Sequence, residues 1–103
     1  MSEQETILAD IKQAVLSVDK QADVLLFGSR ARGDFHEESD WDILILTNEE
    51  VKLKIKFKYY DALFLIQLKH SLLVNPIIRR RVDWANSLNT DLYINVHEDG
   101  VVI

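Results

Sequence analysis

The chain has 103 residues, of which 48% are hydrophobic and 28% are charged, proportions that are typical of an ordinary globular protein. Its formal net charge of −5 argues against bulk binding to nucleic acid or to an anionic membrane, because both need clustered excess lysine and arginine. Since the chain has no cysteine, no signal peptide and no apolar run long enough to span a membrane, we expect a single cytoplasmic domain over residues 1–103, without disulfides or thiolate metal sites.

The sequence begins with a predicted amphipathic helix over residues 3–19. Apolar residues recur there at helical spacing, with charged and amide side chains between them. Ser2 and Glu5 have the spacing of a capping box at the start of this helix. The pattern changes at Ala22–Phe27, which contains a short apolar run that ends at a glycine. This length and boundary predict a strand buried on both faces.

The segment after this strand is rich in turn-forming and charged residues. Residues 28–33 predict a turn that contains about one helical turn, and residues 34–39 predict a polar loop. Ile43–Leu46 is another short apolar run, which predicts a second buried strand.

Two signals conflict in the middle of the chain. Residues 47–50, Thr-Asn-Glu-Glu, have the form of a capping box that would begin a helix. Residues 51–58 alternate apolar side chains with lysine, as a strand does. Because good helix formers follow, we favour one helix from about Glu49 to Lys69.

The remaining segments predict shorter elements. Residues 71–78 form a candidate third strand, in which Pro76 places the strand at a sheet edge or ends it early. Residues 82–88 predict a short helix, residues 91–98 give no clear signal for helix or strand and are left unassigned, and residues 101–103 predict a short extended piece after a turn at Gly100. The pattern as a whole predicts an α/β (α+β) fold with a small mixed sheet and helices packed mainly on one side.

The turn at Gly28 and Ser29 has the chemistry needed to hold a polyphosphate. Glycine lets the main chain approach a phosphate closely, and backbone N–H groups at a turn that opens a helix form an anion site. The Ser29 hydroxyl adds a donor, and Arg30 and Arg32 bring positive charge. For the two arginines, a surface role or an ion pair with the loop at 34–40 is the alternative.

Two carboxylates follow at the start of the second strand. Ten residues separate Ser29 from Asp40, and Asp42 lies two positions further on. Side chains alternate along a strand, so both carboxylates should face one side while Trp41 faces the other. Because like charges on one face repel without a cation, and because carboxylates with substrate phosphates suit Mg²⁺, we predict a magnesium site opposite the phosphate loop.

This pattern resembles the signature of the DNA-polymerase-β-like nucleotidyltransferase superfamily. The elements of the resemblance are Gly28-Ser29, the ten-residue spacing, and Asp40-x-Asp42 on a strand. The short chain and the run at residues 28–33 resemble the minimal nucleotidyltransferase (MNT) branch. The resemblance implies the nucleotidyltransferase fold over most of the chain.

The same resemblance implies an activity and a set of site residues. The activity is transfer of a nucleoside monophosphate, AMP from ATP by family default, to a hydroxyl acceptor, with pyrophosphate leaving and two Mg²⁺ ions at the reacting oxygens. The residues implied for phosphate binding are Gly28, Ser29, Arg30 and Arg32. The residues implied for metal binding and catalysis are Asp40 and Asp42. A HEPN-domain partner, with this chain as the antitoxin of a toxin–antitoxin pair, is also implied; the oligomeric state stays open.

One part of the family pattern has no counterpart in the predicted strands. Active members usually carry a third carboxylate on the third strand, expected near Ser71 or Leu73, and no acidic residue occurs there. A missing base would cost roughly 10²–10⁴-fold in rate. Two functions therefore stay open: an active Mg²⁺-dependent transferase, or a degenerate module that binds nucleotide or a partner without turnover. An unrelated small interaction domain is a third, weaker alternative.

Overall fold

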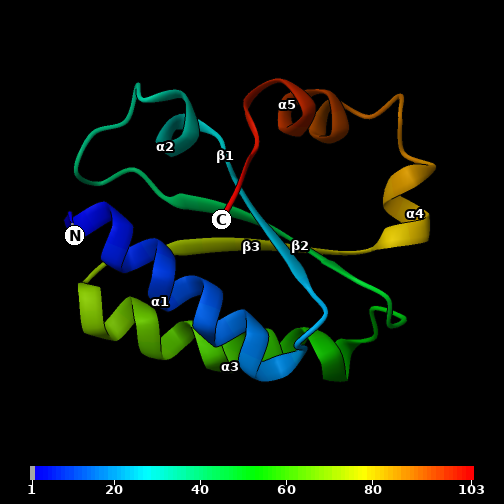
Figure 1. The fold of residues 1–103 in the computed structure, drawn as a ribbon, viewed down its shortest axis with the longest axis horizontal. Coiled ribbons are helices and arrows are strands. Elements are labelled where there is room, and N and C mark those ends of the chain that lie inside the picture. Colours follow the sequence, from blue (N-terminus) through cyan, green and yellow to red (C-terminus); the bar gives the residue numbers. More distant parts are fainter. Residues whose placement is uncertain (1) are drawn as a thin grey trace.

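The computed structural model describes residues 2–103 as a mixed four-stranded sheet between helices (Figure 1). In chain order the elements are α1 (Glu3–Val18), β1 (Asp23–Phe27), α2 (Ser29–Arg32), β2 (Trp41–Thr47), α3 (Leu53–His70), β3 (Val74–Arg80), α4 (Arg81–Ala85), α5 (Asp91–Asp99) and β4 (Val101–Val102). The strand order is β3-β2-β1-β4. Strands β2 and β3 are parallel, whereas β1 is antiparallel to both β2 and β4. The predicted α/β (α+β) class with a small mixed sheet is confirmed.

The two long helices, α1 and α3, lie side by side against one face of the sheet (Figure 1). Alternate residues of β2 point into this layer, so that Trp41, Ile43 and Ile45 are all buried. The opposite face has a much smaller cluster, in which Phe27 and Leu44 pack with Val96 of α5. The helices therefore pack mainly on one side, as predicted, and the face that carries α5 is only partly covered.

The first helix is close to its prediction at both ends. It spans Glu3–Val18, and the Glu5 N–H donates to the Ser2 hydroxyl at 3.1 Å. The cap is therefore present, and the buried side chains Ile7, Ile11 and Val15 form the expected helical stripe.

The predicted start of the long helix is wrong. Thr47 is the last residue of β2 and is fully buried, and α3 begins only at Leu53 after a cap residue, Lys52, that makes no side-chain cap. The Thr47 hydroxyl donates to Asp19 at 2.8 Å and accepts from the Glu49 N–H at 3.2 Å. The threonine thus closes a turn after the strand and ties it to the end of α1. The choice of helix over strand for residues 53–58 is confirmed.

The third strand lies later in the chain than predicted. It spans Val74–Arg80, because α3 continues to His70 and ends at Ser71 in the left-handed conformation, with φ 53°. Pro76 lies inside β3, which is an edge strand, so the predicted edge position is confirmed and early termination is wrong.

The structure assigns the C-terminal segments to two helices and a short strand. The short helix α4 is Arg81–Ala85 rather than residues 82–88. Residues Asp91–Asp99 form α5, whose first turn is capped by the Thr90 hydroxyl accepting from the Tyr93 N–H at 3.2 Å. The predicted extended end is confirmed as β4, which pairs with β1. Across residues 2–103, no helix has the length and apolar character that crossing a membrane requires. The cytoplasmic location stays a prediction.

Candidate nucleotide and metal site

The end of β1 and the start of β2 bring Gly28 against Asp42. The antiparallel register pairs Phe27 with Asp42, so the residue after Phe27 lies beside that carboxylate. Gly28 has φ +76° and ψ −158°, a conformation that is essentially reserved for glycine. A Cβ atom at this position would lie 2.3 Å from the Asp42 Oδ2 atom. Glycine is therefore required here both by the backbone and by the approach of the carboxylate.

The turn that follows presents backbone donors. The Gly28 carbonyl accepts from the N–H groups of Ala31 and Arg32, and the Ser29 carbonyl accepts from Gly33. Within residues 2–103, this leaves the first N–H groups of α2, those of Ser29 and Arg30, without an acceptor. These donors and the Ser29 hydroxyl have the chemistry of an anion site.

The carboxylates lie on either side of a buried tryptophan. Trp41 is 2% exposed and packs with the layer of α1 and α3. Asp42 is half-buried on the next position of β2, and Asp40, just before the strand, is exposed. Both carboxylates therefore lie at the same end of the sheet as the Gly28 turn, where β1 ends and β2 begins.

The third strand places an amide, not a carboxylate, beside Asp42. The parallel register pairs Asp42 with Asn75, and the Asn75 Nδ2 atom donates to Asp42 Oδ1 at 3.1 Å. The expectation that the third position would fall near Ser71 or Leu73 is wrong, because both residues precede β3. The sequence did contain a signal for this position. Asn75 is a polar residue near the start of an apolar strand, just as Asp42 is near the start of β2.

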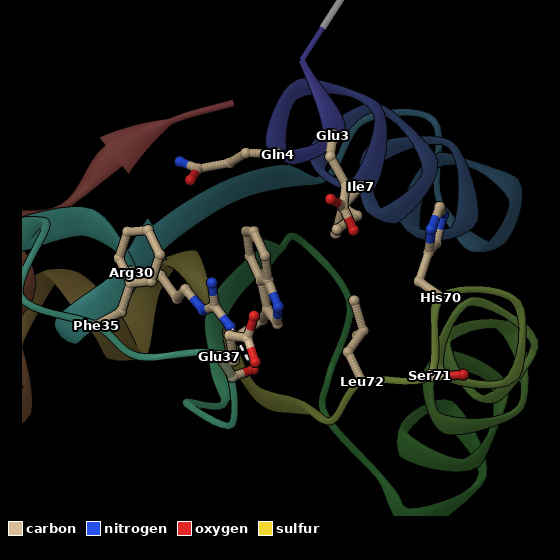
Figure 2. Close-up of a pocket in the computed structure, with 10 residues that line it drawn as sticks. Glu3, Gln4, Ile7, Arg30, Phe35, Glu37, His70, Ser71 and Leu72 are labelled. Atoms are coloured by element: carbon tan, nitrogen blue, oxygen red, sulfur yellow. Dashed lines mark hydrogen bonds between the residues drawn. The ribbon is translucent and has the colours of Figure 1, made fainter.

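Arg30 is engaged by the loop that leads to Asp40. Its guanidinium donates to the Ser39 carbonyl at 3.1 and 3.3 Å and to the Glu37 carbonyl at 3.1 Å. The same group lies 4.4 Å from the Phe35 ring centre and 4.5 Å from that of Trp41. Figure 2 shows the Arg30 side chain beside Phe35 and Glu37. Arg30 therefore fixes the conformation of the loop in front of Asp40.

Arg32 is held by two carboxylates. It pairs with Asp34 at 3.2 Å and with Asp99, at the end of α5, at 3.3 Å. The hydrogen bonds that the Arg32 guanidinium donates to Asp34 and, second in effect, to Asp99 raise the pKa of this group. The alternative for this arginine, an ion pair with the loop at 34–40, is thus present as the pair with Asp34. The pair with Asp99 connects α2 to α5.

The hollow drawn in Figure 2 lies on the other side of the sheet from Asp42. It has a volume of about 410 Å³ and is lined by Arg30, Trp41 and the adjoining ends of α1 and α3, without Asp40 or Asp42. Asp40 is exposed and Asp42 is half-buried at the end of the sheet, which suits a ligand that brings its own charged groups.

The side chains at this end of the sheet fit one magnesium ion. Two carboxylates, Asp40 and Asp42, with the phosphates of a nucleotide make the kind of ligand set that Mg²⁺ uses. Because Gly28 has no Cβ, the turn at residues 28–29 can lie directly against Asp42. Over residues 2–103, no group of three or more His, Cys, Asp or Glu side chains is found that could hold a metal ion by itself.

Comparison with known proteins shows the family to which the chain belongs. Residues 8–103 match the family model described as a nucleotidyltransferase domain. The chain belongs to the nucleotidyltransferase domain family. This nucleotidyltransferase chain is 42% identical over 77 residues to MJ0141 of Methanocaldococcus jannaschii, which is named as a candidate protein adenylyltransferase; the match covers 73% of this chain and 78% of the relative. A second candidate protein adenylyltransferase of that organism, MJ0604, is 36% identical over 81 residues, covering 78% of this chain and 75% of the relative.

The fold is also found in a solved structure. One chain of a toxin–antitoxin crystal structure with AMP-PNP superposes with a TM-score of 0.68 over 91% of this chain and 69% of that chain, at 20% sequence identity. The nucleotidyltransferase-like fold expected from the sequence is thereby confirmed.

Proposed function

We propose that this nucleotidyltransferase chain binds ATP with Mg²⁺ and transfers AMP to a hydroxyl group on a partner protein. The observation that carries the proposal is the close contact between the turn at Gly28 and the carboxylate of Asp42. The Asp42 Oδ2 atom occupies the space that a side chain at residue 28 would fill. The naming of two relatives as candidate protein adenylyltransferases supports AMP as the transferred group and protein as the acceptor.

The proposed roles follow from the positions of the residues. Gly28 and Ser29 bind the phosphates through the free N–H groups and hydroxyl of the α2 turn. Asp40 and Asp42 hold Mg²⁺, which when bound neutralises charge on the triphosphate. Arg30 positions the Asp40 loop, and Arg32 reaches a phosphate by exchanging one of its two carboxylate partners.

The transfer itself needs one bond to form and one to break. The oxygen of the acceptor hydroxyl forms a bond to the α-phosphorus, and the bond from that phosphorus to the pyrophosphate oxygen breaks. The hydroxyl proton passes to water, since Asn75, beside Asp42, cannot accept it. This missing base predicts slow turnover, because a positioned base contributes roughly 10²–10⁴-fold.

The exposed face of α3 supports a partner protein as the acceptor. Large apolar side chains recur there three or four positions apart and form one stripe. We call this set the α3 stripe: Leu53, Phe57, Tyr60, Phe64 and Leu68. Apolar surface of this kind on a small domain commonly marks a protein interface. Lys54 and Lys58 flank the stripe and suit a partner helix with carboxylates along its edges.

The stripe also leads toward the proposed site. A hollow of about 450 Å³ joins Phe64 and Leu68 to Glu37, Glu38 and Ser39, which lie directly before Asp40 in the chain. A protein seated on the stripe would therefore approach the loop that carries the proposed metal ligand. We propose a HEPN-domain protein as this partner, and the toxin–antitoxin structure with the same fold supports a paired assembly.

A second function is favoured by one specific observation. The amide at Asn75 removes the position from which a base would act. The alternative is a module that binds ATP and the partner without turnover.

The experiment that separates the two functions is label transfer. The purified chain is incubated with the co-expressed HEPN-domain partner, Mg²⁺ and ATP labelled at the α-phosphate. Transferase activity predicts label on the partner, and an Asp40→Ala/Asp42→Ala variant should give none. Nucleotide binding without label on the partner would favour the binding module.

A further inference from the structure

Asn75 lies directly beside Asp42, one of the two carboxylates of the proposed site. It is the second residue of β3, in register with Asp42, and it is exposed at the edge of the sheet. Its Nδ2 atom donates to Asp42 Oδ1, while Asp42 Oδ2 lies on the side of Gly28. The two oxygens of one carboxylate are thus directed toward different neighbours.

The hydrogen bond limits what Asp42 can offer to metal ions. An amide is neutral, so Asn75 adds no negative charge, and its NH₂ group uses acceptor capacity of the Oδ1 atom. A second divalent cation beside Asp42 would meet this NH₂ donor, which repels a cation. The free direction of the carboxylate is the one toward the phosphate turn, where a cation bound to the triphosphate would lie.

We infer that Asn75 restricts the site to a single divalent cation, the one that arrives with the nucleoside triphosphate, and positions Asp42 to receive it. The inference rests on the proposed function, since it assumes that Asp40 and Asp42 bind a metal–nucleotide complex. Asn75 is a positioning residue here, because it acts through Asp42. Replacing the Asn75 amide by a carboxylate would open the second cation position.

The test is a count of bound Mn²⁺ ions by electron paramagnetic resonance. Wild-type protein and a non-hydrolysable ATP analogue are mixed in equal amounts and titrated with Mn²⁺, and free Mn²⁺ is read from its solution signal. We expect one tightly bound Mn²⁺ per complex for wild type. The Asn75→Asp variant should bind two, with spectral broadening from the neighbouring ions, and should transfer label to the partner roughly 10²-fold faster.

A second variant controls for the loss of the amide. Asn75→Ala removes the hydrogen-bond donor without adding charge, so it should still bind one Mn²⁺ per complex but hold the nucleotide more weakly. Thermal melting of all three proteins checks the fold, and Mn²⁺ without nucleotide should raise the melting temperature of Asn75→Asp more than that of wild type.

The outcomes separate this inference from the proposed function. Two Mn²⁺ ions in the wild-type complex, or one in the folded Asn75→Asp complex, would overturn the inference and leave metal–nucleotide binding intact. No nucleotide binding and no bound Mn²⁺ in wild type would overturn the proposed function and the inference together.

Discussion

The proposed site joins two regions that supply different chemical groups. The first, from Gly28 to Asp42, keeps the glycine, the serine and both aspartates of the family pattern, and its glycine and second aspartate pack directly against each other. The second, the start of β3, gives an amide at Asn75 where the pattern would place a carboxylate. Holding a nucleotide and removing a proton are therefore separable properties of this fold, because they depend on different strands.

The largest effect should come from Gly28, at the centre of the first region. Gly28→Ala should destabilise the fold by roughly 1–3 kcal/mol, because the backbone conformation is strained for alanine. It should also abolish nucleotide binding, because the new Cβ would displace Asp42. Thermal denaturation and calorimetric titration with ATP measure the two effects.

Gly33→Ala is the matched control for this change. Gly33 also has a positive φ, +89°, but a Cβ there would meet nothing within 4 Å. It should cost about 1 kcal/mol of stability and leave ATP affinity unchanged. Equal loss of ATP binding in both variants would show that strain, rather than displacement of Asp42, is responsible.

A large effect on partner binding alone is expected from the α3 stripe. Replacing Phe64 and Leu68 together by Glu should weaken the complex with the proposed HEPN-domain partner about 30-fold or more, since central apolar contacts of an interface are each worth about 2 kcal/mol. Both side chains are more than half exposed, so the fold and ATP affinity should not change. Size-exclusion chromatography and calorimetry measure the complex; unaltered partner affinity would place the interface elsewhere.

Substitutions of Arg30 test whether this side chain holds the loop before Asp40 or contacts a phosphate of the nucleotide. Arg30→Ala should lower stability by about 1–2 kcal/mol, because it removes hydrogen bonds to two carbonyls and the stacking on Phe35 and Trp41. Arg30→Lys keeps the charge but not the planar group. If Arg30 holds the loop, the lysine variant should resemble alanine in ATP affinity; full recovery by lysine would instead indicate a phosphate contact.

The smallest effect is a pH dependence of the contact between α1 and α3, which involves none of the residues proposed to bind phosphate or metal. Asp10 accepts from His70 at 2.7 Å and from Lys69 at 2.9 Å, and these hydrogen bonds, that of His70 first, lower the pKa of the Asp10 carboxyl. A lowered pKa in the folded state contributes stability above the ordinary value, and this contribution is lost as the pH falls through the lowered value. Wild type should therefore lose its advantage over Asp10→Asn as the pH falls below about 4.

Denaturant titrations at several pH values measure this difference. A stability difference between the two proteins that stays constant from neutral to acidic pH would contradict the assignment. Nucleotide affinity should be equal in both at neutral pH, since Asp10 is not among the residues proposed to bind phosphate or metal.

Much of the first region could be predicted because its signals are local. The two apolar runs, the glycine and the two aspartates lie within the 23 residues from Val24 to Leu46, and alternation along β2 fixes which side Trp41 faces. The errors arose where distant residues decide. Thr47 looked like a helix cap, but its hydroxyl is bound by Asp19, 28 positions earlier. The position of Asn75 depends on the parallel register of β2 and β3, which the length and packing of α3 determine.

The central claim is tested most directly by calorimetric titration with ATP and its non-hydrolysable analogue, with and without Mg²⁺. Wild-type protein and the Asp40→Ala/Asp42→Ala variant should be compared after thermal melting has shown that both are folded. Our account predicts binding that requires Mg²⁺ in wild type and is lost in the double variant. Absence of binding by wild type under every condition, or equal binding by the folded double variant, would contradict it.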